Sequence, residues 1–547
     1  MKQKNYKKNS EYNKIIAQAF NSINKKKFDE AQEYFLEAIK IDKKNYVAYI
    51  NLSNLYLIKN NKTSSINCLF DFLKKNGFNY SIANHLAKVC AQFNLKKDID
   101  NLLKMKKFKN IKLNKYIYYF EGIINEKKNL FHEATISYNR AILCDKYFFD
   151  PYLKFINLLE SKNEINPLEK YINKATKIFH KQNNIYYIYF YKSLFFYRKK
   201  KYKKSEQIIA QYNLEKKLIS SIDYTIRLLD LRSKNLERLN KFNKSFSKIV
   251  KRNHLIKLKD ENKNFNENKI INTISNYKNF YKQENIKNIN KKLNYSDSLN
   301  LVFLVGFPRS GTTLLDTILR THSKITVLEE KPYLLNLRHE YFEKNNNNLL
   351  SLKRLNQKDK DYIVQKYFDL INLTNKSNKK VIIDKLPLSI IELGFIKCIF
   401  PKAKIILALR HPCDVVISCF FSLFKMNDAM INFLNLDNTI DFYHRVFDLF
   451  DSYEKELEMN IHKIKYENIV LNFEESISNL LNFMNLDYER NLKEFNFTAK
   501  SREKISTPSY SQVVNPLYSS SIGRWKKFSI KNELEIKLGK WIKKFNY

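Results

Sequence analysis

The sequence predicts two structural parts, a run of helical repeats followed by an α/β domain with a parallel sheet. Seven of the nine Pro and five of the seven Gly lie at or after Gly306, so the chain changes character near residue 300. Before this point amphipathic helical patterns follow one another, and after it short β-branched runs alternate with helical stretches. A chain of 547 residues is also too long for a single hydrophobic core. We therefore expect a helical domain over residues 1–254, a polar linker over 255–297 and an α/β domain over 298–547.

The chain is strongly basic, with a net charge of +43 and an isoelectric point near 9.7. Such a charge invites a nucleic-acid partner, because Lys and Arg neutralise phosphates. Here, however, the Lys residues are spread along the chain, and Asn, Ile, Tyr and Phe are abundant while Gly and Pro are scarce, which is typical of an AT-rich coding bias. We therefore expect a generally basic, solvated surface and no nucleic-acid partner.

The cysteine spacing and the hydropathy pattern predict the cellular compartment of the protein. The six Cys form no C-x-x-C pair, and scattered thiols in a large chain fit a reducing environment. The N-terminal stretch lacks the apolar core of a signal peptide, and no apolar run is long enough for a membrane span. These features predict a cytoplasmic protein that does not cross a membrane.

The helical part contains a repeated pattern. The segment Phe28–Ala31 recurs as Phe131–Ala134 at an offset of 103 residues, close to three periods of about 34. In each copy an aromatic residue follows the small one after four positions and another small residue after seven. This pattern resembles the second helix of tetratricopeptide repeats, in which small residues let paired helices approach closely. An irregular helical bundle remains the alternative, because several copies are degenerate.

Short apolar runs predict the strands of the second part. Such runs, separated by helices, favour a parallel, doubly wound sheet, in which ligands gather at the carboxyl ends of the strands. We expect strands at residues 301–306, 381–384, 405–409 and 464–466, with helices in the intervals. Candidate functional residues follow each of these strands.

The loop after the first strand is the most informative feature of the chain. The spacing from Gly306 to Gly311 and Thr312-Thr313 matches the phosphate-binding pattern G-x-x-x-x-G-K-[ST], except that Thr312 replaces the Lys. Backbone amides and the following helix N-terminus still make an anion site, and Arg309 adds a planar cation. We expect a nucleotide whose transferred group is not a γ-phosphate. A P-loop NTPase or kinase is an alternative that Thr312 disfavours.

Two further cations follow predicted strands. Lys385, at the end of the second strand, could reach a phosphate or a bridging oxygen. Arg410 follows the third strand, and Ser418 lies eight residues later on a helix that Pro412 opens, so that both could grip one phosphate. Taken alone, Lys385 also fits a structural ion pair, and the Arg410 segment also fits a helix capped by Asp414.

Together these segments resemble the sulfotransferase family, specifically its tyrosylprotein and tetratricopeptide-linked branch, over residues 299–547. The resemblance implies 3′-phosphoadenosine 5′-phosphosulfate as the donor, with Arg410 and Ser418 on its 3′-phosphate and Tyr466 against the nucleotide. Residues 308–313 resemble the 5′-phosphosulfate loop. The implied donor-binding residues there are Arg309, Ser310, Gly311, Thr312 and Thr313.

A later segment, residues 509–516, resembles the part of the family that covers the nucleotide. The resemblance implies that Ser509 assists the chemistry. It also implies donor contacts by Gln512, Val513 and Arg524, the last lying twelve residues after the Gln. The groups implied to stabilise the leaving oxygen and the transferring group are Arg309, Lys385 and Ser509.

The catalytic base is implied by the match to the tyrosylprotein branch. Glu330 aligns with the catalytic carboxylate of that branch, and Glu329 is the alternative. Two positions depart from the pattern. Pro332 replaces an Arg thought to hold acidic peptides, which puts tyrosine in doubt as the acceptor, and Ser422 replaces a basic residue on the nucleotide side. No metal site is evident, and the chemistry requires none.

The predicted function is sulfuryl transfer from 3′-phosphoadenosine 5′-phosphosulfate to a hydroxyl. A protein tyrosine, a glycan or a small molecule remains open as the acceptor, and the concave surface of a repeat domain is suited to hold an acceptor protein or glycan or another partner. The competing hypothesis is an interaction scaffold whose nucleotide fold is vestigial. The intact set of cations argues against such decay.

Overall fold

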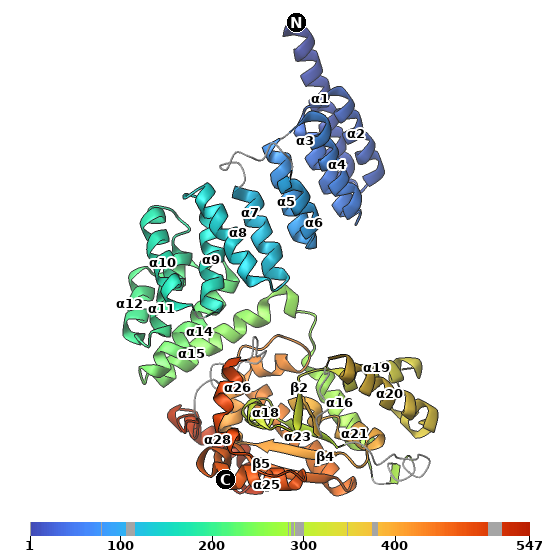
Figure 1. The fold of residues 1–547 in the computed structure, drawn as a ribbon, viewed down its shortest axis with the longest axis vertical. Coiled ribbons are helices and arrows are strands. Elements are labelled where there is room, and N and C mark those ends of the chain that lie inside the picture. The colour runs from blue at the N-terminus through green and yellow to red at the C-terminus, as the bar shows by residue number, and fades with distance from the viewer. Residues whose placement is uncertain are drawn as a thin grey trace. The chain divides into compact units, whose positions relative to one another are not determined.

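The computed structural model describes residues 2–77, 79–104, 115–162, 164–282, 284–285, 289, 300–346, 348–374, 381–501 and 517–547. It separates into two compact units, residues 1–224 and 225–547, and Figure 1 labels many of their elements. Within the described ranges, no helix is both long and apolar enough to cross a membrane. All six cysteines are free thiols.

The first unit is helical throughout its described ranges, and its helices pack as successive pairs such as α1–α2, α3–α4, α7–α8 and α11–α12. The bounds are α1 Lys2–Asn24, α2 Phe28–Ile41, α3 Tyr46–Ile58, α4 Lys62–Asn76, α5 Tyr80–Phe93, α6 Lys96–Lys104, α7 Lys115–Lys127, α8 Phe131–Cys144, α9 Phe149–Ser161, α10 Ile165–Phe179, α11 Tyr186–Arg198, α12 Tyr202–Gln211 and α13 Leu214–Lys217.

Several pairs turn in the same way. Asn60, Asn129 and Lys200 all have a left-handed backbone, with φ of 56°, 60° and 57°, and each lies two residues before its pair's second helix begins. A single left-handed residue reverses the chain in very few residues, and Asn adopts this conformation more readily than most other residues. The same turn recurs at the same place in these pairs, as is expected of repeated units.

Small residues lie where the helices of a pair touch. The hydroxyls of Ser53 and Ser65 are 2.7 Å apart, and those of Ser193 and Ser205 are 2.8 Å apart. Both serine pairs are buried and are separated by twelve residues in the sequence. Each hydroxyl can therefore satisfy the other at a point where a larger side chain would separate the helices.

Aromatic side chains fill the space beside these contacts. Phe35 and Tyr138, the aromatics of the predicted pattern, are fully buried. A Cβ atom at Gly122 would lie only 2.5 Å from the ring of Tyr138, so α7 can approach α8 because this position has no side chain. The predicted tetratricopeptide-like repeats are thus confirmed as helix pairs with small residues at their contacts.

The second unit combines helices with a five-stranded sheet. The strands are β1 Leu301–Gly306, β2 Ile325–Glu329, β3 Val381–Lys385, β4 Lys404–Leu409 and β5 Asn460–Lys465. The helices are α14 Ile222–Arg238, which starts just before the division, α15 Phe242–Leu258, α16 Glu267–Phe280, α18 Thr312–Thr321, α19 Tyr333–Lys344, α20 Gln357–Thr374, α21 Leu393–Ile399, α22 Pro412–Phe421, α23 Leu436–Glu456, α24 Tyr466–Leu471, α25 Phe473–Phe483, α26 Phe495–Ser501 and α28 Lys531–Lys544.

The sheet is parallel throughout, with strand order β2-β3-β1-β4-β5. The predicted parallel sheet is therefore confirmed, and β1, β3 and β4 end within one residue of the predicted bounds. The prediction missed β2, a strand of only five residues beside the loop helix. It also placed the start of β5 four residues too late, because this edge strand carries exposed polar residues that hide the strand pattern. Tyr466 begins α24 and does not end the strand.

The register brings the candidate residues to one edge of the sheet. Lys385 of β3 pairs with Leu304 of β1 and with Glu329 of β2. Gly306 at the end of β1 pairs with Ala408 of β4, two residues before Arg410. The carboxyl ends of four strands thus converge, as expected for a ligand site in a parallel α/β sheet.

Two hydrophobic cores hold this sheet in place. Phe303 and Val305 of β1 belong to a core that includes side chains of α16, α21, α22, α23 and α28, whereas Val302 and Leu304 belong to a second core with α18, α24, α25 and α26. Successive residues of a strand point to opposite faces, so both faces of β1 are buried. Figure 1 shows α18, α23 and α25 beside the strands in the second unit. The fold thereby presents a rigid edge from which the loops project.

One buried carboxyl group lies under this edge. Asp384 of β3 is 4% exposed, and its Oδ2 accepts a hydrogen bond of 2.7 Å from the Tyr367 hydroxyl. Burial raises the pKa of Asp384 from 3.8 to about 6, and the hydrogen bond from Tyr367 opposes this shift only in part. The folded protein therefore holds the proton more tightly than the unfolded chain, so this group's contribution to stability falls as the pH rises from about 4 to about 6.

We expect Asp384→Asn to stabilise the protein at neutral pH. Asn keeps an acceptor for Tyr367 but cannot ionise, and the cost removed is on the order of 2 kcal/mol, or a few degrees in melting temperature. Calorimetric melting of both proteins between pH 4 and pH 8 measures the effect. The variant should melt higher at pH 8, and the difference should vanish near pH 4.

Asp437→Asn is the matched control, because the Asp437 side chain is 74% exposed. A melting difference for Asp384→Asn that stayed constant across the pH range would contradict the assigned cause.

Candidate functional site

The loop that joins β1 to α18 has an unusual backbone. Arg309 and Gly311 both adopt the left-handed conformation, with φ of 70° and 96°. For Arg309 this conformation is uncommon and indicates local strain, which concentrates at functional sites. The helix α18 begins at Thr312 directly after Gly311, and no side chain caps its N-terminus. The loop therefore has the form of an anion site at a helix N-terminus.

Two arginines that follow different strands meet at this loop, Arg309 of the loop itself and Arg410 after β4. The Nε of Arg309 donates a hydrogen bond of 3.0 Å to Ser418 Oγ, and Arg410 Nη1 donates one of 3.4 Å to the Arg309 carbonyl. Burial lowers the pKa of Arg309 to about 10, and the neighbouring charges of Arg410 and Arg524 act in the same direction. A buried group of like charges is stabilised by an anion. The geometry thus joins the loop to Arg410 and Ser418, as the sequence predicts.

Tyr466 closes one side of the loop. Its ring lies so near Gly311 that a Cβ there would be 2.9 Å from Tyr466 Cδ2. The Arg410 guanidinium lies over the same ring, 4.9 Å from its centre. The Tyr466 hydroxyl is 2.7 Å from Ser521 Oγ, and Arg410 Nη2 donates to the Ser521 carbonyl at 2.6 Å. Tyr466 and Arg410 thereby hold the C-terminal segment near the loop.

Two polar atoms of this cluster have no hydrogen-bond partner among the described residues. They are Ser310 Oγ and Arg410 Nε, and both are buried. Ser310 itself is only 2% exposed. Buried polar atoms are almost always satisfied, so the exceptions need an explanation. Oxygens of a phosphate or sulfate group would satisfy both atoms and offset the arginine charges, so the residues present fit the predicted donor.

A buried lysine forms a second charged cluster at the end of β3. Lys385 has no exposed surface, and its Nζ donates to Glu330 Oε1 at 2.8 Å. The same ammonium is 3.6 Å from Asp316 Oδ2 and 3.9 Å from Glu329 Oε1. Asp316 also pairs with Arg320 at 2.9 Å. Lys385 therefore links the loop helix α18 to the end of β2.

Glu330 is the most accessible carboxylate of this cluster. Its side chain is 32% exposed, against 14% for Glu329 and none for Asp316. The backbone at Glu330 is left-handed, with φ of 49°, and its N–H donates to the Lys385 carbonyl at 2.8 Å. This turn brings Glu330 out of the strand while Lys385 still holds its carboxylate. Because the Glu330 side chain is more exposed than the Glu329 side chain, Glu330 is the better placed of the two to accept a proton from an acceptor hydroxyl.

The C-terminal segment is tied to the site by Asp414. Its buried carboxylate accepts hydrogen bonds from the N–H groups of Gly523 and Trp525, at 2.7 and 3.0 Å. Arg410 Nη2 lies 3.8 Å from the same carboxylate. Asp414 thus holds a remote segment and does not cap α22, whose N-cap position is His411 with no side-chain cap hydrogen bond.

The C-terminal segment that Asp414 holds also packs against His411. The imidazole stacks on Trp525, with ring centres 5.1 Å apart, and burial lowers its pKa. A histidine packed in this way has a structural role, in agreement with the sequence reasoning that gave the base to a carboxylate.

Arg524 is described, but the rest of the predicted covering segment is not. Arg524 Nε and Nη2 donate to the two carboxylate oxygens of Glu237, at 2.6 and 2.7 Å. Its guanidinium also lies 4.7 Å from the centre of the Phe421 ring. The predicted residues Ser509, Gln512 and Val513 lie outside the described residues.

Sequence reasoning missed three contributors to the site. Asp316 was a detectable one, because it is the sole charged residue in the apolar start of the loop helix. Ser521 acts chiefly through its backbone carbonyl, which carries no sequence signal. Glu237 lies more than 280 positions before its partner Arg524, so only the fold could bring the two together.

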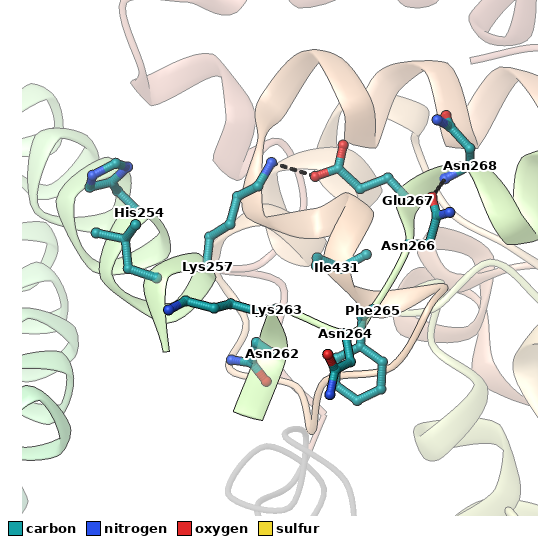
Figure 2. Close-up of a pocket in the computed structure, with 11 residues that line it drawn as sticks. His254, Lys257, Asn262, Lys263, Asn264, Phe265, Asn266, Glu267, Asn268 and Ile431 are labelled. Carbon is teal, nitrogen blue, oxygen red and sulfur yellow. Dashed lines mark hydrogen bonds and ion pairs between the residues drawn. The ribbon is translucent and has the colours of Figure 1, made fainter. Parts of the chain in front are cut away.

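A groove of about 870 Å³ lies elsewhere in the second unit, where α15 leads into α16. Figure 2 shows it between the end of α15 and Ile431, with several amide side chains on its wall. Lys257 on this wall pairs with Glu267 at 2.5 Å, so its charge is compensated. None of the lining residues belongs to the predicted site. The described ranges also contain no group of three or more His, Cys, Asp or Glu side chains that could hold a metal ion.

Comparison with known proteins identifies the family of the second part. The model of the sulfotransferase family matches residues 302–490, which include the loop, both carboxylate candidates, Lys385, Arg410, Ser418 and Tyr466.

Two curated relatives match larger parts of the chain. An uncharacterised protein of Aquifex aeolicus strain VF5 is 25% identical over 54% of this chain, and the match covers 39% of that protein. Protein-tyrosine sulfotransferase 1 of Danio rerio is 23% identical over 44% of this chain and 69% of its own length. The chain thus spans well under half of the first of these relatives.

A solved structure, the sulfotransferase domain from the olefin synthase of Synechococcus PCC 7002, is 18% identical over 47% of this chain and 98% of that domain, with a TM-score of 0.32. The family-model match and the loop geometry place the family resemblance in the second unit. Residues 302–490 of this chain are a sulfotransferase-family domain, and the same chain carries tetratricopeptide-like helical repeats before it.

Proposed function

We propose that the protein transfers a sulfuryl group from 3′-phosphoadenosine 5′-phosphosulfate to a hydroxyl of a protein, at tyrosine, or of a glycan. The observation that carries the proposal is the convergence of Arg309, Arg410 and Ser418 on the loop, with the Lys385–Glu330 pair at the same sheet edge. An ATP-dependent enzyme is disfavoured, because Thr312 stands where such a loop has its Lys.

The donor would be held at its two charged ends. The loop residues Ser310 to Thr313 would hold the 5′-phosphate, and Arg410 with Ser418 would hold the 3′-phosphate. Support comes from Ser310 Oγ and Arg410 Nε, which are buried and have no hydrogen-bond partner among the described residues, so that phosphate oxygens could satisfy them. When bound, the donor supplies a sulfuryl group joined to a phosphate that leaves with the bond electrons. Gln512 and Val513 are proposed to cover it.

Glu330 is the proposed general base. The acceptor hydroxyl must lose its proton as the new S–O bond forms, and Glu330 has the most exposed side chain of the carboxylates around Lys385. Lys385 holds that carboxylate in place at 2.8 Å. Arg309, Lys385 and Ser509 are proposed to offset the negative charge that grows on the leaving oxygen. The products are a sulfate ester and adenosine 3′,5′-bisphosphate.

The repeats of the first unit are proposed to bind the acceptor or a partner protein. The name of the Danio rerio relative supports a protein tyrosine, whereas Pro332 in place of the predicted Arg leaves room for a glycan. The six free cysteines support a reducing compartment, so we propose the cytoplasm as the place of the reaction.

Nucleotide binding tests the proposal most directly. Thermal stabilisation by adenosine 3′,5′-bisphosphate should exceed that by ATP with Mg²⁺, and labelled sulfate from the donor should appear in a panel of tyrosine peptides and glycans. Stabilisation by ATP but not by the bisphosphate would exclude the proposal. Binding of the bisphosphate without transfer to any acceptor would favour the scaffold hypothesis.

We expect Glu330→Gln to lower transfer by about 10²- to 10⁴-fold, because a general base is removed. The bisphosphate dissociation constant should change less than about threefold, since Gln still accepts a hydrogen bond from Lys385. Initial rates with saturating donor and isothermal titration measure the two effects.

Glu329→Gln is the matched control for this variant and should retain most of the activity. Arg410→Ala should give the opposite pattern to Glu330→Gln, with binding weakened by about tenfold or more. A loss of transfer in Glu329→Gln together with an active Glu330→Gln would reverse the assignment of the base.

We also expect Gly311→Ala to abolish detectable binding of the bisphosphate. Ala at φ of 96° is strained, and its Cβ would press on Tyr466 at 2.9 Å, so the loop must move. Gly539→Ala is the control, because a Cβ there meets no atom within 4 Å and the residue lies inside α28. That change should stabilise the helix slightly and leave binding unchanged. Normal binding by Gly311→Ala would show that the loop does not hold the nucleotide.

A further inference from the structure

The helix pair α14–α15 lies before the sulfotransferase-family domain in the sequence, yet it contacts the donor site. By its pattern the pair is a repeat. Ser233 and Ser245 are twelve residues apart with their hydroxyls at 2.8 Å, as in the pairs of the first unit, and Asn240 has the left-handed turn with φ of 58° two residues before α15. By its contacts it belongs to the second unit, which begins at residue 225.

One contact of this pair supports the helix that carries Ser418. The guanidinium of Arg252 is fully buried and donates to the carbonyls of Phe420 and Phe421, at 3.2 and 3.0 Å, while Asn253 donates to the Phe420 carbonyl at 3.0 Å. These carbonyls end α22 and have no partner inside that helix. Asp230 pairs with Arg252 at 2.6 Å and compensates its charge. The pair thereby anchors the C-terminal end of α22.

The second contact reaches a predicted donor ligand. Glu237, in the last turn of α14, takes both Nε and Nη2 of Arg524 in a bidentate ion pair. Arg524 is close enough to Arg309 for its charge to lower the pKa of Arg309. It also lies over Phe421, which follows Ser418 by three residues on α22. Arg524 therefore belongs to the same cationic cluster as Arg309, and Glu237 fixes its orientation.

We infer that Glu237 is a positioning residue for the donor, which holds Arg524 ready for the 3′-phosphate and makes the helix pair α14–α15 part of the nucleotide site. The inference rests on the proposed function. A guanidinium has five N–H donors in a rigid fork, so a carboxylate on the Nε–Nη2 edge leaves the other Nη1 edge for a second anion. An Arg that is already ordered loses less conformational freedom when the ligand binds.

The test measures preference for the 3′-phosphate. Isothermal titration of the full-length protein with adenosine 3′,5′-bisphosphate and with adenosine 5′-monophosphate yields two dissociation constants. Their ratio is the constant of the monophosphate divided by that of the bisphosphate, so a large ratio means a strong preference for the 3′-phosphate. In Arg524→Ala the bisphosphate should bind about tenfold or more weakly, whereas the monophosphate should be little affected. Glu237→Ala should reduce the ratio in the same direction by about threefold to tenfold, because Arg524 must then be ordered by the ligand.

A double-mutant cycle separates positioning from a general loss of structure. In the Arg524→Ala background, Glu237→Ala should have no further effect on the ratio. Asp437→Ala is the matched control, since it removes a carboxylate from an exposed ion pair with Lys537 and should leave the ratio unchanged. Arg252 is not a suitable probe, because removal of a buried paired charge tests folding.

Three outcomes would overturn the inference. The ratio could stay unchanged in Glu237→Ala, it could rise, which would mean that Glu237 competes with the phosphate, or the two substitutions could act additively. Failure of the wild-type protein to bind the bisphosphate would instead refute the proposed function. The two failures are therefore distinguishable.

Discussion

Burial of like charges is the constraint on which the second unit depends. Arg309, Arg410 and Lys385 come from three different strand ends; Arg410 and Lys385 are buried, and Arg309 is half-buried. A charge in a medium of low dielectric constant is costly unless an opposite charge or a set of acceptors compensates it. The compensation is uneven. Lys385 lies within 4 Å of three carboxylates, whereas Arg410 lies within that distance of the Asp414 carboxylate at 3.8 Å and otherwise donates to backbone carbonyls. The edge therefore has two sides. An anion would compensate the cations Arg309 and Arg410 on one side, whereas the carboxylates around Lys385 on the other side can accept a proton.

The parallel sheet makes this arrangement possible. In such a sheet every strand ends at the same edge, so residues more than 70 positions apart in the sequence become neighbours. The cores on the two faces of the sheet fix the strands, and the strained conformations at Arg309 and Glu330 occur only in the residues just beyond the strand ends. Packing of the sheet therefore holds backbone geometry that the loops could not hold by themselves.

The sequence allowed much of this to be predicted, for reasons that differ between residues. Apolar runs located β1, β3 and β4 because buried strands are apolar on both faces, and the same criterion failed for the polar edge strand β5. The phosphate loop was recognisable because its function constrains adjacent residues. Glu237 and Ser521 were not predictable, since the first acts across a long sequence separation and the second through its backbone. The three residues of the covering segment stay predictions.

The pair α14–α15 shows why sequence pattern and tertiary contact can assign one element differently. Its serine contact and its left-handed turn are local features, and they identify a repeat. The contacts of Arg252 and Glu237 with the rest of the second unit leave these features unchanged, so the repeat pattern does not indicate what these two side chains contact. A buried Arg is tolerated only where several acceptors meet it, and here Asp230 and the two last carbonyls of α22 do so together. All the hydrogen bonds of this network form only when the pair α14–α15 packs against the end of α22, so the pair belongs structurally to the second unit. The pattern of the preceding repeats is unaffected.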